Sequence, residues 1–388
     1  MFNTAARIQP PVPFAPPLVG PDEIAEVVAT LESGWLTTGP RVAAFEQAFA
    51  EYTDAPFAVA LNSCTAALHL SLLAAGIGPG DEVVTTPLTF CATANTIVHT
   101  GASPVFADID PVTFNLDPGA AAAAISPVTR ALLPVHFGGR PADTTAFAAI
   151  ARHNRLRVIE DAAHCVEGIA AGRKVGSIGD FTCFSFYATK NLTTGEGGMV
   201  TTHDERAASF MRAASLHGMS RDAWMRYAPG STGGYDVIMA GFKYNMMDLQ
   251  AAIGLHQLAR LEERLARREA IWEAYDNAFA GLPLRLPPPA DAGDRHARHL
   301  YTVLVDERSA GVTRDRLRER LAERGVSTSV HFRALHLQPY YQERFGMRRG
   351  MFPAAELVSD TTMSLPLSAA MTPETVDRVI EAVHDAFL

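Results

Sequence analysis

Seven short strand-type runs, most of them continuously apolar, lie between residues 57 and 202. They are FAVALN (57–62), DEVVTTP (81–87), SPVFADI (103–109), RALLPVHF (130–137), RVIED (157–161), FTCFSF (181–186) and GMVTT (198–202). Runs of this length and type are typical of strands that are buried on both faces of a parallel sheet. Helical patterns separate them, for example in residues 65–76 and 143–154. The alternation predicts an α/β fold in which a large domain holds a mostly parallel sheet covered by helices.

The pattern changes after residue 202. Residues 248–282 place apolar side chains at three- and four-residue steps between charges, which predicts one or two amphipathic helices. The prolines of residues 283–294 predict a linker. Beyond it, a β-α-β-α order is predicted for the segments 299–307, 313–325, 326–332 and 372–388. We therefore expect an N-terminal arm (1–20), a large domain (21–255), and a long connecting helix with a smaller C-terminal α/β domain (256–388).

Composition narrows the classes of function. The 388 residues are 48% hydrophobic and 19% charged with a formal net charge of −9, and the mean hydropathy is +0.05. This is typical of a globular chain with a sizeable core. The interspersed charges argue against a nucleic-acid binder, and we see neither a signal peptide nor a membrane span. We expect a cytoplasmic protein with four reduced cysteines and, because no zinc-type or HExxH spacing occurs, no metal site.

Candidate chemistry lies where the predicted strands end, since ligands of parallel sheets gather at carboxyl ends. Lys190 follows the run at 181–186 and precedes several glycines, which we expect to let the backbone pass close to a cofactor. Most lysines are solvated on the surface, but an amine in a partly desolvated site is a nucleophile for a carbonyl. Asp161 ends the run at 157–161. It is either a helix N-cap or a buried anion that pairs with a cation, such as the protonated ring nitrogen of pyridoxal phosphate.

A phosphate site is expected beside these two residues. Residues 62–70 (NSCTAALHL) are a strand end that runs into a helix, and helix N-termini bind phosphate through free N–H groups. Ser63, Thr65 and Ser185 add hydroxyl groups, although the same stretch also fits an ordinary helix cap. Phe90 offers a flat face for stacking on a pyridine ring, and taken alone it fits the core equally well. The glycines of residues 76–82 follow a helix, the wrong order for a dinucleotide site, and predict a turn.

Five segments in this order resemble the DegT/DnrJ/EryC1/StrS family of sugar aminotransferases. They are NSCTAALHLSL, TTPLTFCATANTI, VIEDAAH, FSFYATKNLTTGEGGMV and GFKYNMMDLQAAIGLHQL, and the similarity runs from about residue 31 to about residue 364. The resemblance implies fold type I (the aspartate aminotransferase fold), pyridoxal phosphate (PLP) as cofactor, and a homodimer with shared active sites. Some relatives carry histidine in place of the lysine and dehydrate their substrate, so Lys190 favours an aminotransferase.

The resemblance also implies a role for each matching residue. Lys190 forms the Schiff base with the cofactor and moves the proton, Asp161 pairs with the ring nitrogen, and Phe90 and His164 flank the ring. The positions that bind the cofactor phosphate match Cys64, Thr65, Ser185 and, reaching across from the partner subunit, Asn245. Many relatives read GYNYRM where this chain reads GFKYNM, so the resemblance leaves open whether Lys243 or Asn245 makes that contact.

The stretches SGWLTTGP, GFKYN and HFRALHLQPYYQERFG are most similar to the branch that aminates C4 of UDP-linked 4-keto sugars. The expected reaction moves nitrogen from L-glutamate, or from glutamine, to a nucleotide-linked 4-keto sugar. Candidate substrate contacts are Thr37, Thr38, Lys243, His331 and Arg333, and Arg333 alternatively holds the carboxylate of the donor. The open alternatives are amination at another sugar position or of a keto-cyclitol, a PLP-dependent lyase of the same fold, and a non-enzymatic cofactor-binding role.

Overall fold

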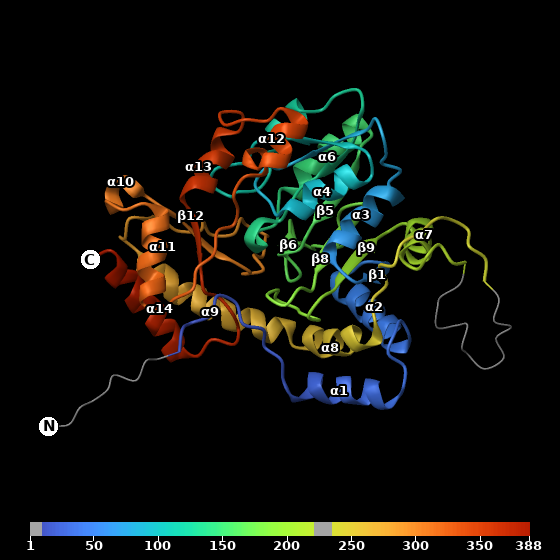
Figure 1. The fold of residues 1–388 in the computed structure, drawn as a ribbon, viewed down its shortest axis with the longest axis horizontal. Coiled ribbons are helices and arrows are strands. Elements are labelled where there is room, and N and C mark those ends of the chain that lie inside the picture. The colour runs from blue at the N-terminus through green and yellow to red at the C-terminus, as the bar shows by residue number, and fades with distance from the viewer. Residues whose placement is uncertain (1–9, 221–234) are drawn as a thin grey trace.

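The computed structural model describes residues 10–220 and 235–388. Its large sheet has seven strands, in the spatial order β1-β9-β8-β5-β4-β2-β3 (Figure 1). They are β1 (Phe57–Leu61), β2 (Glu82–Thr85), β3 (Ser103–Phe106), β4 (Thr129–Leu133), β5 (Arg157–Asp161), β8 (Phe181–Ser185) and β9 (Gly198–Thr202). All seven predicted runs are strands of this sheet. Strands β3, β2, β4, β5 and β8 are parallel to one another, while β9 is antiparallel to both β8 and β1. The predicted α/β fold with a mostly parallel sheet is confirmed.

Helices cover both faces of the sheet, because successive side chains of a strand point to opposite faces. On one face, Val59 and Ile159 pack with α3 (Cys64–Ala74), α4 (Cys91–His99) and α7 (Glu205–Ser215). On the other face, the core is built with four further helices. These are α2 (Pro40–Thr53), α5 (Pro118–Ala123), α6 (Thr144–Asn154) and α8 (Asp248–Ala259). Since both faces are buried, the strands read as continuous apolar runs rather than as alternating ones.

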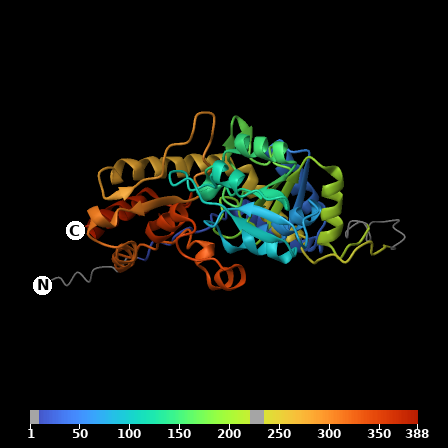
Figure 2. The same cartoon turned by 90° about the horizontal axis from the view of Figure 1, so that it is seen from above.

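The amphipathic region after residue 247 forms two helices, α8 and α9 (Leu261–Phe279), which follow one another with a break at Arg260. Figure 2 shows them along one side of the molecule, running from the large sheet to the C-terminal part. The apolar side of α9 contributes Trp272, Tyr275 and Phe279 to a second hydrophobic core. The connecting helix is therefore part of the core that it reaches.

The second core packs against a three-stranded antiparallel sheet. The elements of this part are β10 (Leu284–Arg285), β11 (Tyr301–Val305), α10 (Glu307–Ala310), α11 (Arg314–Glu323), α12 (Pro339–Phe345), α13 (Pro353–Thr361), β12 (Thr362–Leu365) and α14 (Pro373–Ala386). A separate two-stranded hairpin, β6 (Ile169–Ala170) and β7 (Arg173–Lys174), comes between β5 and β8 in the sequence. The predicted strand at 326–332 is wrong. That segment makes only isolated bridges, from Val326 to Val12 and from Ser329 to Ser364, because β12 takes the place beside β11.

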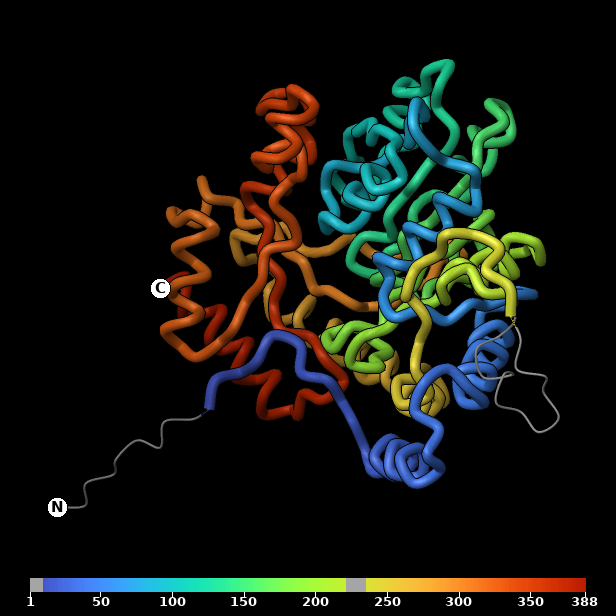
Figure 3. The backbone as a smooth tube through the Cα atoms, turned by 45° about the vertical axis from the view of Figure 1, so that its right-hand side comes forward, coloured from blue at the N-terminus to red at the C-terminus, as the bar shows by residue number. Residues whose placement is uncertain are grey.

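Residues 10–20 of the expected N-terminal arm lie against the C-terminal part of the chain, ahead of α1 (Pro21–Glu32), as the blue tube in Figure 3 shows. The N–H of Val12 donates to the carbonyl oxygen of Gly325 at 2.7 Å, and the N–H of Leu367 donates to that of Phe14 at 3.3 Å. The remaining arm residues, 1–9, fall outside the described ranges. The predicted division of the chain at residues 20 and 255 stays a prediction, and residue 255 itself lies within α8.

The structure also bears on the predicted turn at residues 76–82, on the cysteines and on membrane-spanning helices. The glycine-rich segment at 76–82 is a turn between α3 and β2, in which the N–H of Gly78 donates to a carboxylate oxygen of Asp81 at 3.0 Å. All four cysteines are free, and Cys165 and Cys183 are buried. Within residues 10–220 and 235–388, no helix is long and apolar enough to cross a membrane.

Candidate active site

Lys190 lies in the loop between β8 and β9, where its N–H donates to the carbonyl oxygen of Tyr187 at 2.9 Å. The residue is partly buried. Desolvation lowers the pKa of the amine from 10.5 to about 8, and the nearby Cys64 and Asp161 oppose that effect. A larger share of the amine is thus uncharged near neutral pH than for an ordinary lysine, as a nucleophile toward a carbonyl requires.

Asp161 ends β5 with its side chain 5% exposed. One carboxylate oxygen accepts a hydrogen bond from Thr93 Oγ1 at 2.7 Å, and the other accepts from the N–H of Ala163 at 3.1 Å. The Thr93 hydroxyl is in turn 2.8 Å from that of Thr89. The chain after Asp161 makes a turn and no α-helix, so the helix N-cap interpretation is wrong. Burial raises the pKa of Asp161, with Thr93 opposing it, so a cation that pairs with this carboxylate would offset its desolvation.

His164 follows in the turn after β5, and its Nδ1 accepts a hydrogen bond from the N–H of Gly138 at 3.2 Å. Burial lowers the pKa of His164 well below its usual value, so the ring is neutral and carries its proton on Nε2. The ring lies nearly parallel to that of Phe332, with centroids 6.1 Å apart, and Phe332 is 6.3 Å from Phe90. Phe90 is 59% exposed at the start of α4, so it is not a core residue. Its ring is available for a ligand.

The residues expected at the phosphate lie around the start of α3. Ser63 caps this helix, accepting from the N–H of Ala66 at 3.1 Å. Cys64 and Thr65, the first two residues of the helix, have N–H groups without intrahelical acceptors. Thr65 is exposed, whereas Ser185 is buried at the end of β8. The helix start can therefore present N–H groups and a hydroxyl to an anion.

One of the glycines after Lys190 has a purpose that the sequence did not reveal. A Cβ atom on Gly198 would overlap the backbone of Ser63 and Cys64. Glycine lets β9 pass against the start of α3, so this close approach is between two parts of the protein and not between backbone and cofactor. Gly195, by contrast, has a φ of +80° and open space around it, as a turn requires.

The other candidates lie in two segments, residues 37–38 and 243–245, which touch at Thr38 and Asn245. Asn245 Nδ2 donates to Thr38 Oγ1 at 2.7 Å, and Asn245 forms a backbone bridge with Leu61 at the end of β1. The carbonyl oxygen of Thr37 accepts from the first N–H of α8 at 3.2 Å, and Lys243 is exposed. Within one chain, none of the contacts recorded among the described residues joins these four residues to Lys190. Their roles stay predictions.

A cleft of about 680 Å³ opens between α4 and the segment after residue 331, and it is lined by Phe90, Arg333 and Tyr340 among others. This volume suits a small-molecule ligand. Arg333 is exposed, and its Nη2 donates to the carbonyl oxygen of Leu337 at 3.0 Å. His331 lies nearby in sequence, with Nδ1 2.8 Å from Ser364 Oγ, and burial lowers its pKa to about 3. The cleft thus combines aromatic faces with a cation.

Sequence reasoning missed several residues that the structure brings to this place. Thr93 binds the Asp161 carboxylate, and its only signal was its position four residues after Thr89 in a helix. Asn191 directly follows Lys190 in sequence, and its side chain contacts His299, which comes from a segment more than one hundred residues away. The spacing HARH at 296–299 gave no hint of that contact, because it arises from tertiary structure alone.

The residues present fit a pyridoxal phosphate group. A buried carboxylate of raised pKa suits a pyridinium, a lysine of lowered pKa suits a Schiff base, an exposed aromatic ring suits the ring face, and a helix N-terminus suits the phosphate. No group of three or more His, Cys, Asp or Glu side chains in the described part of the chain is arranged to hold a metal ion.

Comparisons with known proteins agree with this geometry. The model of the DegT/DnrJ/EryC1/StrS aminotransferase family matches residues 17–384. The spore coat polysaccharide biosynthesis protein SpsC of Bacillus subtilis (strain 168) is 54% identical over 375 residues, 96% of either chain.

Solved structures are similar as well. The putative sugar aminotransferase Spr1654 from Streptococcus pneumoniae in its PMP form has a TM-score of 0.90 at 34% identity, covering 97% of this chain and 99% of that one. Its PLP form has a TM-score of 0.89 at 33% identity, covering 97% and 98%. PseC of Helicobacter pylori, an aminotransferase involved in the biosynthesis of pseudoaminic acid, has a TM-score of 0.89 at 28% identity, covering 97% and 99%.

Proposed function

Because this chain belongs to the DegT/DnrJ/EryC1/StrS aminotransferase family, we propose that it moves an amino group from L-glutamate to C4 of a nucleotide-linked 4-keto sugar, with UDP as the nucleotide. The enzyme is a PLP-dependent sugar aminotransferase. The observation that carries the proposed reaction is the placement of two groups at the ends of adjacent strands. They are a lysine of lowered pKa, Lys190 after β8, and a buried carboxylate, Asp161 on β5.

Each side chain of the site has its own role in the proposed reaction. When bound, PLP supplies an electron sink that stabilises negative charge at the substrate carbon. Asp161 would hold the group at its ring nitrogen and favour the protonated form, and Thr93 orients this carboxylate. Lys190 holds and moves the proton at its Nζ, for which a pKa of about 8 is close to the working pH. Phe90 and His164 would flank the ring, and the neutral His164 would add no positive charge beside it.

The proposed enzyme is a homodimer with shared active sites. Support comes from the place of Lys243 and Asn245 beside the end of β1, which leads into the expected phosphate residues: Asn245 bridges Leu61, and the carbonyl oxygen of Lys243 accepts from Asn62 Nδ2 at 3.3 Å. In a dimer, the partner subunit's Asn245 would complete the phosphate site formed by Cys64, Thr65 and Ser185. The cytoplasmic location expected from the sequence stays a prediction.

The proposed place of the acceptor is the cleft beside Phe90. Arg333 supplies a cation at its wall for the diphosphate or, alternatively, for the carboxylate of the amino donor. His331 is held neutral by burial and faces Ser364, so it would contact the sugar as a hydrogen-bonding group and not as a charge.

The test is a coupled assay with [¹⁵N]glutamate and a panel of acceptors: UDP-, dTDP- and GDP-linked 4-keto sugars, a 3-keto sugar nucleotide and a keto-cyclitol. The proposal predicts ¹⁵N in the amino group at C4 of a UDP-linked product, and none with Lys190→Ala. Transfer to a 3-keto sugar or to the cyclitol alone would contradict it, as would release of product from a cysteine derivative without any acceptor, which is the lyase alternative. If none of the amino donors and none of the acceptors exchanges nitrogen with the protein, the enzymatic role is contradicted.

A further inference from the structure

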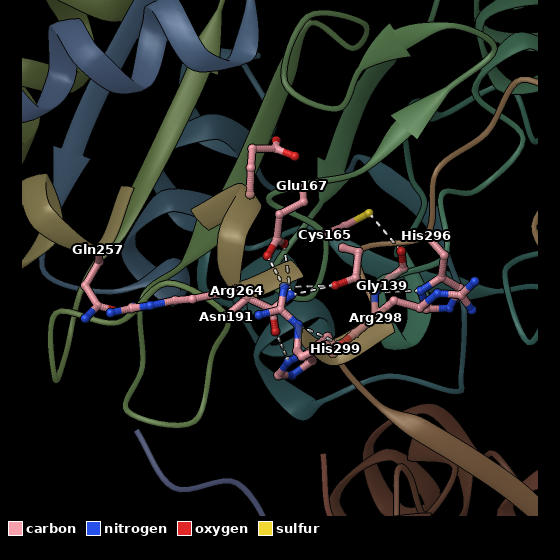
Figure 4. Close-up of polar contacts among 12 residues, drawn as sticks. Gly139, Cys165, Glu167, Asn191, Gln257, Arg264, His296, Arg298 and His299 are labelled. Carbon is pink, nitrogen blue, oxygen red and sulfur yellow. Dashed lines mark hydrogen bonds and ion pairs between the residues drawn. The ribbon is translucent and has the colours of Figure 1, made fainter. Parts of the chain in front are cut away.

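The side chain of Asn191, the residue after Lys190, uses all of its hydrogen-bonding groups inside the protein. Its Nδ2 donates to Glu167 Oε2 at 2.9 Å and to the carbonyl oxygen of Ala297 at 2.8 Å, and its Oδ1 is 3.0 Å from His299 Nδ1 (Figure 4). The Glu167 carboxylate and the Ala297 carbonyl oxygen can accept hydrogen bonds but cannot donate them. The amide nitrogen of Asn191 must therefore be the atom that faces them, which fixes the orientation of the amide. His299 Nδ1 is therefore the donor in the third contact.

The partners of Asn191 belong to three separate parts of the chain. Glu167 follows β5, and its carboxylate is also paired with Arg268 of α9, both side chains being almost completely buried. Arg268 Nε donates to the carbonyl oxygen of Arg298 at 3.1 Å, in the segment that leads to β11. The loop of Lys190 is thus fastened through one amide to the turn after β5, to the connecting helix and to residues 297–299.

His299 lies against the residue expected to flank the cofactor ring. The ring centroids of His299 and His164 are 4.5 Å apart. The ring of His164 and the backbone of His299 both contact the turn at Gly138. The N–H of Gly138 donates to His164 Nδ1, and its carbonyl oxygen accepts from the backbone N–H of His299 at 3.2 Å. Burial lowers the pKa of His299, as it does that of His164, so both rings are neutral. Each has one ring nitrogen committed to a protein partner.

We propose that Asn191 and His299 are positioning residues for the active site: Asn191 anchors the Lys190 loop and fixes His299 through Nδ1, and His299 in turn fixes the ring of His164. This inference rests on the proposed function in one respect, the placement of His164 at the cofactor. It assigns no contact with substrate to either residue. Both act through the neighbours that they hold.

The first test uses the cofactor-free protein, so that it does not depend on turnover. The pH dependence of Lys190 acetylation by acetic anhydride, followed by peptide mass spectrometry, reports the pKa of the amine. Cys64, Asp161, His164, His299 and His331 are the titratable groups that act on or respond to this lysine. In Asn191→Ala, the loosened loop admits water and the labelling midpoint rises by about one pH unit from its value near 8.

Gln257 provides a matched control, because its amide has the same kinds of partner: a carboxylate, a backbone carbonyl and a side-chain donor. It donates to Glu23 at 2.7 Å and to the carbonyl oxygen of Leu18 at 2.9 Å, and it accepts from Arg264. Gln257 lines the same small cavity as Lys190 and Asn191 but makes none of the contacts with the histidines. Gln257→Ala therefore removes buried hydrogen bonds beside Lys190 without touching the Asn191–His299 contact, and we expect its labelling midpoint to stay at the wild-type value. An unchanged midpoint in Asn191→Ala, or an equal shift in both variants, would overturn the inference.

The second test separates a specific contact from general packing. His299→Asn retains a donor where Nδ1 lies, whereas His299→Gln places its amide farther along the side chain. We expect His299→Asn to keep the wild-type labelling midpoint, and His299→Gln to shift upward like Asn191→Ala. With the loaded enzyme and glutamate, His299→Gln should lose kcat about 10- to 100-fold at an unchanged KM. Equal behaviour of the two variants would overturn the proposal.

Failure of the proposed function would be recognised separately. If no keto sugar accepts nitrogen, the amination proposal falls, while the labelling midpoints of the cofactor-free variants still support or overturn the positioning role. If the midpoints do not move but ¹⁵N transfer occurs, the positioning role falls and the function stands.

Discussion

Replacing Lys190 with methionine should stabilise the cofactor-free protein while abolishing its activity. The amine is held where its charged form is disfavoured, since desolvation lowers its pKa from 10.5 to about 8. Methionine fills a similar volume without a charge. We therefore expect Lys190 to lower the free energy of unfolding of the cofactor-free protein, although the reaction needs this residue.

The magnitude follows from the pKa. A decrease from 10.5 to about 8 corresponds to ~3.5 kcal/mol at about 1.4 kcal/mol per pH unit. Below pH 8 both folded and unfolded lysine are protonated, so the full cost is present. Between pH 8 and 10.5 the unfolded chain binds more protons than the folded one, so the stability of the wild type rises with pH in that window. We expect Lys190→Met to gain up to ~3.5 kcal/mol at pH 7 and roughly half of that at pH 9.5.

The assay is equilibrium unfolding in urea of both cofactor-free proteins at pH 7 and pH 9.5. Lys243→Met is the control, because this lysine is exposed and its loss should change the free energy of unfolding by less than about 0.5 kcal/mol. A Lys190→Met protein that is no more stable than the wild type at pH 7, or whose gain does not shrink at pH 9.5, would refute the reasoning.

Three further predictions concern neighbouring residues. Thr93→Val removes the hydroxyl donor to Asp161, which raises the pKa of that carboxyl further and should weaken PLP binding about tenfold in a fluorescence titration, since a hydrogen bond to a charged group contributes about 1.5–3 kcal/mol. Gly198→Ala places a methyl group against the backbone at the start of α3 and should lower the urea midpoint by the equivalent of about 1–3 kcal/mol, whereas an unchanged midpoint would show that the two segments separate freely. Phe14→Ala removes the ring that lies 5.6 Å from His331, and steady-state kinetics should show a higher KM for the sugar acceptor with an unchanged KM for glutamate.

The sequence predicted the large sheet well for a physical reason. Strands such as β5 and β8 are buried on both faces, so their apolar runs are continuous and cannot be mistaken for exposed loops. Their ends could then be read for chemistry, which placed Lys190 and Asp161 in one site. The antiparallel direction of β9 could not be read, because a strand's composition does not record which way its neighbour runs.

The C-terminal part was harder to predict. Residues 326–332 have the residue types of a strand, but only single bridges form there, and the ladder beside β11 goes to the four-residue β12. Contacts such as Asn191 to His299 and Thr93 to Asp161 join segments far apart in sequence. Nothing in local periodicity encodes them, so they became visible only when the fold brought the segments together.

The measurement that tests the account most directly is borohydride reduction of the protein with PLP, followed by peptide mapping. The chain has three lysines, at positions 174, 190 and 243, so the outcome is unambiguous. We expect a phosphopyridoxyl group on Lys190 alone, with loss of the adduct in Lys190→Met. Stoichiometric adduct on Lys174 or Lys243, or a protein that gains none, would contradict the claim that burial makes Lys190 the amine that receives the cofactor.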